Sequence, residues 1–301
     1  MPLSVFPKGF FSALIEHRMS LDEWLELAAT LEVDGVELYP AFLHSFESEY
    51  LSALSRRLRS VGLRMPMLCH SPDFVRESAT ERRREVDETR RMIGVAARLG
   101  GRYCRVLSGQ RRPGIGDEGL GWVIECLEAL LPHAEDAGVV LCLENHYKDG
   151  NWHYPEYAQS RERYLAILDA LPSPWLCAQY DPSNAVVAGI DPYELLDRIV
   201  DRVATVHASD RYLKGGTVED LKRLDADPVH GYARILRHGV IGEGLNDYDR
   251  IFRILGEHGF DGWISIEDGE GETVEMGMEN LRRSVAFLRE KMAQWLPTLT
   301  S

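Results

Sequence analysis

Four side chains that can bind a metal ion stand at the ends of four successive apolar runs. They are Glu144, Asp181, His207 and Glu267. One acidic residue in such a place often only caps the next helix, but four in succession are hard to attribute to capping. Ionisable groups at the ends of buried strands are costly unless they are paired or bind a cation. The pattern therefore predicts a site of several carboxylates and one imidazole.

Three carboxylates and one histidine suit a hard or borderline divalent ion. We expect one ion per chain, Mn²⁺ or Mg²⁺ in preference to Co²⁺ or Zn²⁺. The alternative is a carboxylate–histidine network without a metal, in which the neighbouring carboxylates would repel one another strongly. Glu37, at the end of an earlier run, is a further candidate ligand.

The elements that must position these residues are short apolar runs that alternate with longer helical patterns. The runs lie at 3–10, 35–39, 63–69, 103–107, 139–144, 176–181, 203–207 and 263–267, and the helical patterns begin after Ser20 and continue at 47–61, 78–99, 117–137, 160–171, 191–200, 246–258 and 273–293. Strands that alternate with helices predict a parallel sheet with right-handed crossovers. Eight such units fit a closed (β/α)₈ TIM barrel better than an open doubly wound sheet, and no GxGxxG follows the first run. We therefore expect one α/β domain over residues 1–301, with the strand ends at one mouth of the barrel.

An insertion interrupts the regular spacing after the seventh run. His207 and Glu267 stand about twice as far apart in sequence as the neighbouring pairs of candidate ligands, which places an insertion at 211–244. Long loops at this end of a barrel are usually lids or subunit contacts. His230 and His238 lie in the insertion and either line the site or are ordinary loop residues.

Six segments together resemble a known superfamily. They are Asp-Gly-Val-Glu-Leu at 34–38, Leu-Glu-Asn-His at 143–146, Asp-Pro-Ser-Asn at 181–184, Val-His-Ala-Ser-Asp at 206–210, Gly-Glu-Gly at 242–244 and Gly-Trp-Ile-Ser-Ile-Glu at 262–267. Over about residues 20–290 the chain resembles the xylose-isomerase-like TIM barrels, often called sugar phosphate isomerases/epimerases. That superfamily includes tagatose/psicose 3-epimerases, inosose dehydratases and endonuclease IV. The resemblance implies metal ligation by Glu144, Asp181, His207 and Glu267, the same four residues.

Two carboxylates around a divalent ion suit removal of the proton alpha to a carbonyl, through a metal-stabilised enediolate. The resemblance implies that Glu144 and Glu267 are the catalytic acid and base of a sugar, cyclic polyol or keto-sugar isomerase or epimerase. If a β-hydroxyl or glycosidic oxygen leaves instead, the same chemistry gives a dehydratase or lyase acting on an inosose, a 3-keto-glycoside or a dehydroshikimate-like substrate. A barrel that only binds a metal or ligand is the non-catalytic alternative.

Several further polar residues stand at or just beyond the strand ends. We expect Lys8, His70, His146, Asn184 and Arg211 to bind substrate. Trp152, in the aromatic loop 147–157, could stack on a sugar ring or pack the loop onto the barrel. Sugar 3-epimerases commonly have a histidine where this chain has Asn184, which counts against a free-ketose epimerase. No glycine-rich phosphate cradle is evident, although Arg211 and Lys214 could meet a phosphate.

The charge of the chain excludes some partners. Its 301 residues include 48 acidic and 34 basic ones, a formal net charge of −14. Nucleic-acid binding relies on clustered Lys and Arg, so the charge counts against an abasic-site endonuclease, which also needs three zinc ions and additional histidines. The five cysteines form no CxxC pair, and neither a signal peptide nor a membrane span is evident. We expect a cytoplasmic protein that acts on small molecules, binds neither nucleic acid nor membranes and could form a homo-oligomer.

Overall fold

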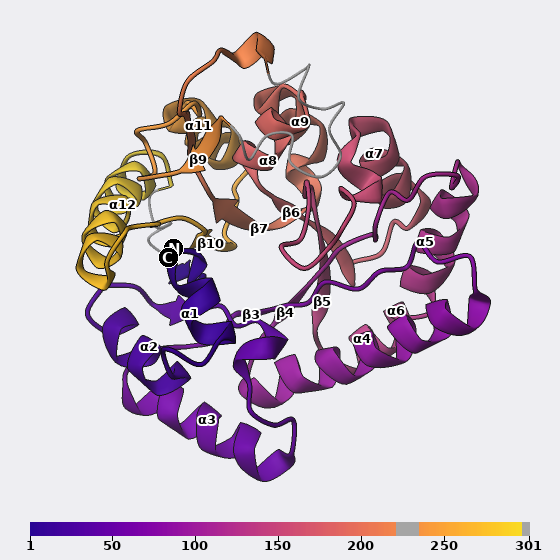
Figure 1. Cartoon of the computed structure of the whole chain (residues 1–301), viewed down its shortest axis with the longest axis horizontal. Helices are drawn as coiled ribbons and strands as arrows, with labels where there is room; N and C mark the ends of the chain where they lie inside the picture. The colour runs from indigo at the N-terminus through magenta and orange to yellow at the C-terminus, as the bar shows by residue number, and fades with distance from the viewer. Residues whose placement is uncertain (221–234, 297–301) are drawn as a thin grey trace.

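The computed structural model, which describes residues 1–220 and 235–296, arranges eight parallel strands around one axis (Figure 1). The strands are β1 (Leu3–Val5), β2 (Gly35–Val36), β3 (Met67–Cys69), β4 (Tyr103–Val106), β5 (Val140–Glu144), β6 (Leu176–Tyr180), β7 (Val203–Ala208) and β10 (Trp263–Ile266). Their order in the sheet is β2-β1-β10-β7-β6-β5-β4-β3. Single bridges from Gly35 to Arg64 and from Leu38 to Leu68 join β2 to β3 and close the barrel. The predicted TIM-barrel fold is confirmed.

Helices surround the barrel and cover its outer face (Figure 1). They are α1 (Phe11–Ile15), α2 (Leu21–Ala28), α3 (Ser48–Ser60), α4 (Ala79–Leu99), α5 (Glu118–Glu128), α6 (Leu131–Ala137), α7 (Arg161–Ala170), α8 (Pro182–Val187), α9 (Pro192–Ile199), α11 (Tyr248–Glu257) and α12 (Val274–Trp295), with short 3₁₀ turns η1 (Lys8–Phe10), η2 (Pro40–Phe42), η3 (Tyr157–Gln159) and η4 (Val200–Arg202). Ser20 begins α2 in a capping box with Glu23. The prediction of one helix over 117–137 is wrong, because the helix breaks before α6. Pro132 stands in the first turn of α6, where its missing N–H is tolerated.

The hydrophobic core occupies both sides of the sheet. All five residues of β5 are buried, as expected for a parallel strand that is covered on both faces. On the outer side, α2 contributes Trp24 and Leu25, which have no exposed surface. No helix in the described ranges is both long enough and apolar enough to cross a membrane.

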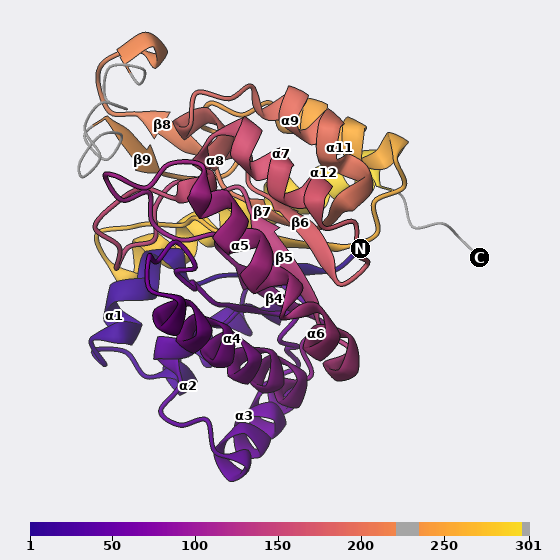
Figure 2. The same ribbon diagram turned by 90° about the vertical axis from the view of Figure 1, so that its right-hand side faces the viewer.

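Within the predicted insertion, β8 (Arg211–Leu213) and β9 (Leu236–His238) pair as an antiparallel hairpin. Figure 2 shows these two strands at the end of the barrel opposite the N-terminus. Asp210, just after β7, accepts hydrogen bonds from the backbone N–H groups of Gly242, Gly244 and Asn246. A Cβ atom on Gly244 would overlap Asp210 Oδ1, so this close approach requires glycine.

A second buried carboxylate ties the hairpin to the last strand. Asp268, just after β10, accepts from the N–H groups of Asp210 and Gly239. His238 Nδ1 lies 3.1 Å from Asp268 Oδ1. His230 falls outside the described residues. The hairpin is therefore attached to the ends of β7 and β10, beside the candidate ligands.

Candidate metal centre

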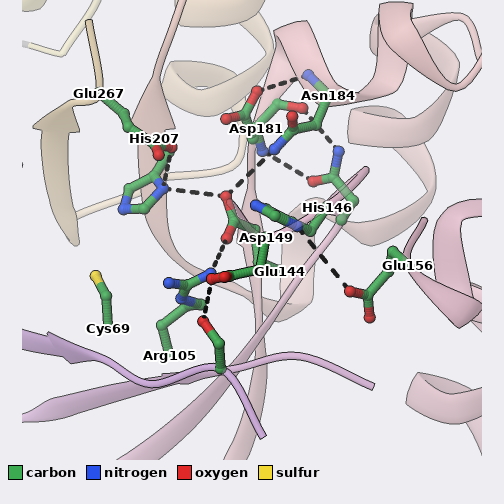
Figure 3. A network of polar contacts seen from close by, with 12 residues as sticks. Cys69, Arg105, Glu144, His146, Asp149, Glu156, Asp181, Asn184, His207 and Glu267 are labelled. Carbon is green, nitrogen blue, oxygen red and sulfur yellow. Dashed lines mark hydrogen bonds and ion pairs between the residues drawn. The ribbon is translucent and has the colours of Figure 1, made fainter. Parts of the chain in front are cut away.

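The four side chains predicted as ligands converge at the carboxyl ends of four neighbouring strands (Figure 3). Glu144 ends β5, Asp181 follows β6, His207 lies in β7 and Glu267 follows β10. One ligand atom from each lies within 4.8 Å of those of the other three, and all four residues are buried. The sheet order explains this, because β5, β6, β7 and β10 are adjacent.

The imidazole of His207 is held by carboxylates on both ring nitrogens. Nδ1 lies 3.1 Å from Glu144 Oε1 and 2.9 Å from Glu267 Oε2, while Nε2 lies 2.8 Å from Glu37 Oε2. Nδ1 therefore faces the cluster, and Nε2–H donates to Glu37. A carboxylate behind a metal-binding histidine fixes the ring orientation and the tautomer.

Glu37, Cys69 and His207 form a second group that could hold a metal ion. The Cys69 thiol donates to Glu37 Oε2 at 3.3 Å. Burial raises the pKa of Cys69 to about 12, so the sulfur carries its proton at neutral pH. We therefore assign Glu37 to the orientation of His207 rather than to direct ligation.

The electrostatics of the four-residue cluster fit a cation. Burial, and then the charges of Glu267 and Glu144, raise the pKa of Asp181. Burial opposes a charge on His207, but Glu37, Glu267 and Glu144 outweigh it and raise the pKa of the imidazole well above its ordinary value. Burial opposes the charge on Glu144 and Glu267, but the neighbouring imidazoles and cations outweigh it and lower the pKa of both carboxyls. Three buried carboxylates around one imidazole form a site that a divalent ion would stabilise. The donors, three carboxylates and one imidazole, are those that hard and borderline ions prefer.

Local hydrogen bonds orient Asp181. This residue caps α8, and its Oδ1 accepts from the Asn184 N–H at 2.8 Å and from Ser209 Oγ at 2.7 Å. Asn145 pairs with the backbone of Asp181: its Nδ2 donates to the carbonyl at 2.7 Å and its Oδ1 accepts the N–H at 2.8 Å. Asn145 therefore joins the ends of β5 and β6, a role that the sequence did not indicate.

Each predicted acid/base glutamate has its own cation. Arg105 on β4, which is also buried, places Nη1 3.1 Å from Glu144 Oε2. Lys8 Nζ lies 3.5 Å from Glu267 Oε1. Glu267 is 8% exposed and Glu144 only 1%, so Glu267 is the more accessible of the two. Arg105 was not among the predicted site residues; its one signal in the sequence is a charge within an otherwise apolar strand.

Three of the other predicted substrate-binding residues, Asn184, Arg211 and His146, lie around the cluster, and His70 is close enough to Arg105 for that charge to act on its pKa. Asn184 Nδ2 donates to Glu144 Oε1 at 3.4 Å, and Arg211 Nη2 donates to Asn184 Oδ1 at 3.4 Å. Burial lowers the pKa of His146 to about 4 and that of His70 to about 3. Both imidazoles are therefore neutral near pH 7 and can each donate and accept a hydrogen bond.

The loop after β5 holds the remaining candidate. Trp152 is half-buried there, and its backbone N–H donates to Asp149 O at 3.1 Å. Among the described residues, no hydrogen bond joins its indole to the cluster. The same loop contributes Glu156, which is buried and places Oε2 4.0 Å from His146 Nδ1. Glu156 rather than Trp152 thus lies beside a residue of the site.

Comparisons with known proteins agree with the barrel fold. The chain is 23% identical to an inosose dehydratase of Clostridium beijerinckii over 161 aligned residues. The aligned region covers 52% of this chain and 50% of that protein. The chain thus spans about half the length of the curated relatives it matches. Among solved structures, a D-tagatose 3-epimerase-like protein superposes with a TM-score of 0.73 at 20% identity, over 100% of both chains. The IOLI protein with a bound zinc atom superposes with a TM-score of 0.74 at 18% identity, over 99% of this chain and 100% of that one.

A family model described as xylose isomerase-like TIM barrel matches residues 25–291. That match covers nearly the whole barrel and includes all four residues of the cluster. The chain belongs to the family of xylose isomerase-like TIM barrels.

Proposed function

We propose that this protein is a divalent-metal-dependent enzyme that removes the proton alpha to a carbonyl of a small sugar or cyclic polyol. The observation that carries the proposal is the placement of two buried glutamates, Glu144 and Glu267, within 3.1 Å of one imidazole nitrogen. Each glutamate also has a separate cation, Arg105 or Lys8. This arrangement provides two carboxylates for proton transfer in one site.

Glu144, Asp181, His207 and Glu267 would hold the ion. Because carboxylate oxygens predominate and no thiolate takes part, we propose Mn²⁺ or Mg²⁺ before Zn²⁺ or Co²⁺. When bound, such an ion supplies positive charge that polarises a carbonyl and stabilises the negative charge that develops beside it.

Proton transfer is the work of the protein's own side chains. One of the two glutamates takes the proton from the carbon beside the carbonyl, and the other returns a proton. Return to the opposite face of the same carbon gives an epimer, and return to the neighbouring carbon gives an aldose–ketose isomer. The neutral His70 and His146 and the amide of Asn184 would hold the hydroxyl groups of the substrate.

Dehydration is the second candidate reaction. The relatives at 21–28% identity are described as inosose dehydratases. In this reaction the same proton is removed, and the hydroxyl on the next carbon leaves as water after it receives a proton.

Exchange of deuterium from D₂O into the substrate tests the proposal. We would incubate the Mn²⁺-loaded protein with ketoses, inososes, 3-keto-glycosides and dehydroshikimate, and follow each compound by mass spectrometry and NMR. Deuterium at one carbon with the formula retained identifies an epimerase or isomerase, and loss of one water identifies a dehydratase.

The controls are two matched substitutions. Glu267→Gln should abolish exchange, whereas Glu290→Gln, an exposed glutamate on α12, should leave it unchanged. Absence of exchange across the panel with the metal bound would refute the proposed activity and favour a barrel that only binds a ligand.

A further inference from the structure

A cavity adjoins the candidate metal centre, because one of its lining residues, Lys8, lies 3.5 Å from Glu267. It has a volume of about 240 Å³, and its lining includes Lys8, Tyr147, Arg211, Arg237, His238 and Glu270. These residues come from η1, the loop after β5, the β8–β9 hairpin and the segment after β10. Since a water molecule takes up about 30 Å³ in the liquid, the cavity can accept one end of a small organic molecule.

The charge of this cavity is opposite in sign to that of the chain. Three basic side chains and one carboxylate line it, although the formal net charge of the protein is −14. Like charges that converge on one cavity repel each other unless an anion lies between them. Lys8 already has Glu267 at 3.5 Å, so Arg211 is the residue that favours a negatively charged occupant.

Arg211 gives the strongest indication that the cavity binds an anion. It is only 7% exposed, and its Nε is buried without a hydrogen-bond partner. Its other contacts are the long 3.4 Å bond to Asn184 and the ring of Tyr147, whose centroid lies 4.8 Å from Cζ. Within residues 1–220 and 235–296, no carboxylate forms an ion pair with Arg211. Arg105 is buried to a similar degree but has Glu144 at 3.1 Å.

The cavity is connected to the reaction centre by its own lining residues. Lys8 lies 3.5 Å from Glu267, and Arg211 reaches Glu144 through Asn184. His238, opposite Arg211 in the hairpin register, is held neutral because burial and the nearby Arg211 and Lys8 lower its pKa. A substrate with its carbonyl at the metal centre could thus place another group beside Lys8 and Arg211.

We propose that this cavity binds an oxyanion of the substrate, so that the protein acts on acidic keto-sugars in preference to neutral ones. The proposal rests on the proposed function for the identity of the reacting carbonyl. A carboxylate is the expected group, because Glu270 on the cavity wall disfavours the double charge of a phosphate. Arginine is suited to either group, since its planar guanidinium forms paired hydrogen bonds with oxyanions.

Binding of non-reacting analogues tests the cavity without any turnover. We would titrate the Mn²⁺-loaded protein by calorimetry with glucitol, gluconate and glucitol 6-phosphate. Gluconate should bind at least about tenfold more tightly than glucitol, which corresponds to about 1.4 kcal/mol for the added charged contact. Tighter binding of glucitol 6-phosphate than of gluconate would identify the oxyanion as a phosphate. Equal affinity for the neutral and acidic compounds, or binding of none of them, overturns the proposal.

Substitutions locate the effect. Arg211→Gln should bring the affinity for gluconate down to that for glucitol, while Arg253→Gln, an exposed arginine on α11, should preserve the difference. Because Arg211 is buried, Arg211→Lys provides a variant that keeps the charge and should retain most of the preference. If Arg211→Gln folds and still prefers gluconate, the assignment of the oxyanion to this cavity is wrong.

A substrate series separates this proposal from the proposed function. Fructose, fructuronate and fructose 6-phosphate share one carbonyl and differ only at the far carbon. Deuterium exchange that is equally fast with fructose and fructuronate would overturn the oxyanion site and leave the proposed function intact. Absence of exchange with all three, together with tighter binding of gluconate, would refute proton abstraction from these ketoses and leave the oxyanion site intact.

Discussion

Substitution of Glu37 by glutamine tests whether this residue acts on the metal centre through His207. The two side chains are buried, and Glu37 Oε2 lies 2.8 Å from His207 Nε2. Hydrogen bonds to charged groups contribute about 1.5–3 kcal/mol, and loss of such a partner behind a ligand typically weakens metal binding about 10–100-fold. Since the glutamine oxygen can still accept from Nε2–H, we expect the lower part of that range, about tenfold weaker binding of Mn²⁺.

Two further variants distinguish orientation from direct ligation. Glu37→Leu removes the acceptor altogether and should weaken Mn²⁺ binding about 100-fold. Cys69→Ala should leave Mn²⁺ binding unchanged, because the protonated thiol only donates to Glu37. Calorimetric titration of each metal-free variant measures the affinities, and circular dichroism checks the fold.

Two outcomes would refute the role assigned to Glu37. If Glu37→Gln binds Mn²⁺ within about twofold of the unsubstituted protein, Glu37 does not act through His207. If Cys69→Ala weakens binding as much as Glu37→Gln, the metal lies at the Glu37–Cys69–His207 group instead.

Three further predictions concern catalysis, metal removal and pH. Glu267→Gln should abolish deuterium exchange without lowering the melting temperature by more than a few degrees, since glutamine has nearly the same size and shape as glutamate; an active variant would exclude Glu267 as acid or base. Removal of the metal by EDTA should lower the free energy of unfolding by about 2.7 kcal/mol, compared with the protein at a metal concentration 100 times the dissociation constant. A melting temperature that changes with neither EDTA nor Mn²⁺ would contradict the metal centre. Burial raises the pKa of Glu156 to about 8 from an ordinary value of 4.5, so its contribution to stability is complete below pH 4.5 and is lost as the pH rises to about 8. Glu156→Gln should remove that loss, which is about 5 kcal/mol. If urea unfolding shows the same change in the free energy of unfolding with pH for both proteins, the assignment is refuted.

Much of the barrel and the position of the cluster follow from patterns that are local in sequence. Alternating apolar runs and helical segments predict parallel strands, and the carboxyl ends of parallel strands lie at the same mouth of a barrel. For this reason Glu144, Asp181, His207 and Glu267 could be selected before any coordinates were known. The boundary of a helix was less predictable, as the break before Pro132 shows.

Partnerships between distant residues required the tertiary structure. In the sequence, Arg105 is a single charged residue within an apolar strand. Only the register of β4 against β5 shows that it lies beside Glu144. Glu37 could have been a ligand or a neighbour of one, and the side-chain geometry places it behind His207. Asn145 lies within the Leu-Glu-Asn-His segment at 143–146. Its hydrogen bonds to the backbone of Asp181 nevertheless depend on the adjacency of β5 and β6.

The sequence by itself determined which side chains stand at the strand ends and therefore which ones meet at the mouth of the barrel, because strand period and order decide that. Only the tertiary structure decided which nitrogen of His207 faces the cluster, which cation accompanies each glutamate, and where Lys8 and Arg211 share a cavity. The physical reason is that these features depend on distances of a few ångströms between residues far apart in the chain. Rotamers, strand register and the position of the β8–β9 hairpin set those distances, and hydrophobic periodicity carries no information about them.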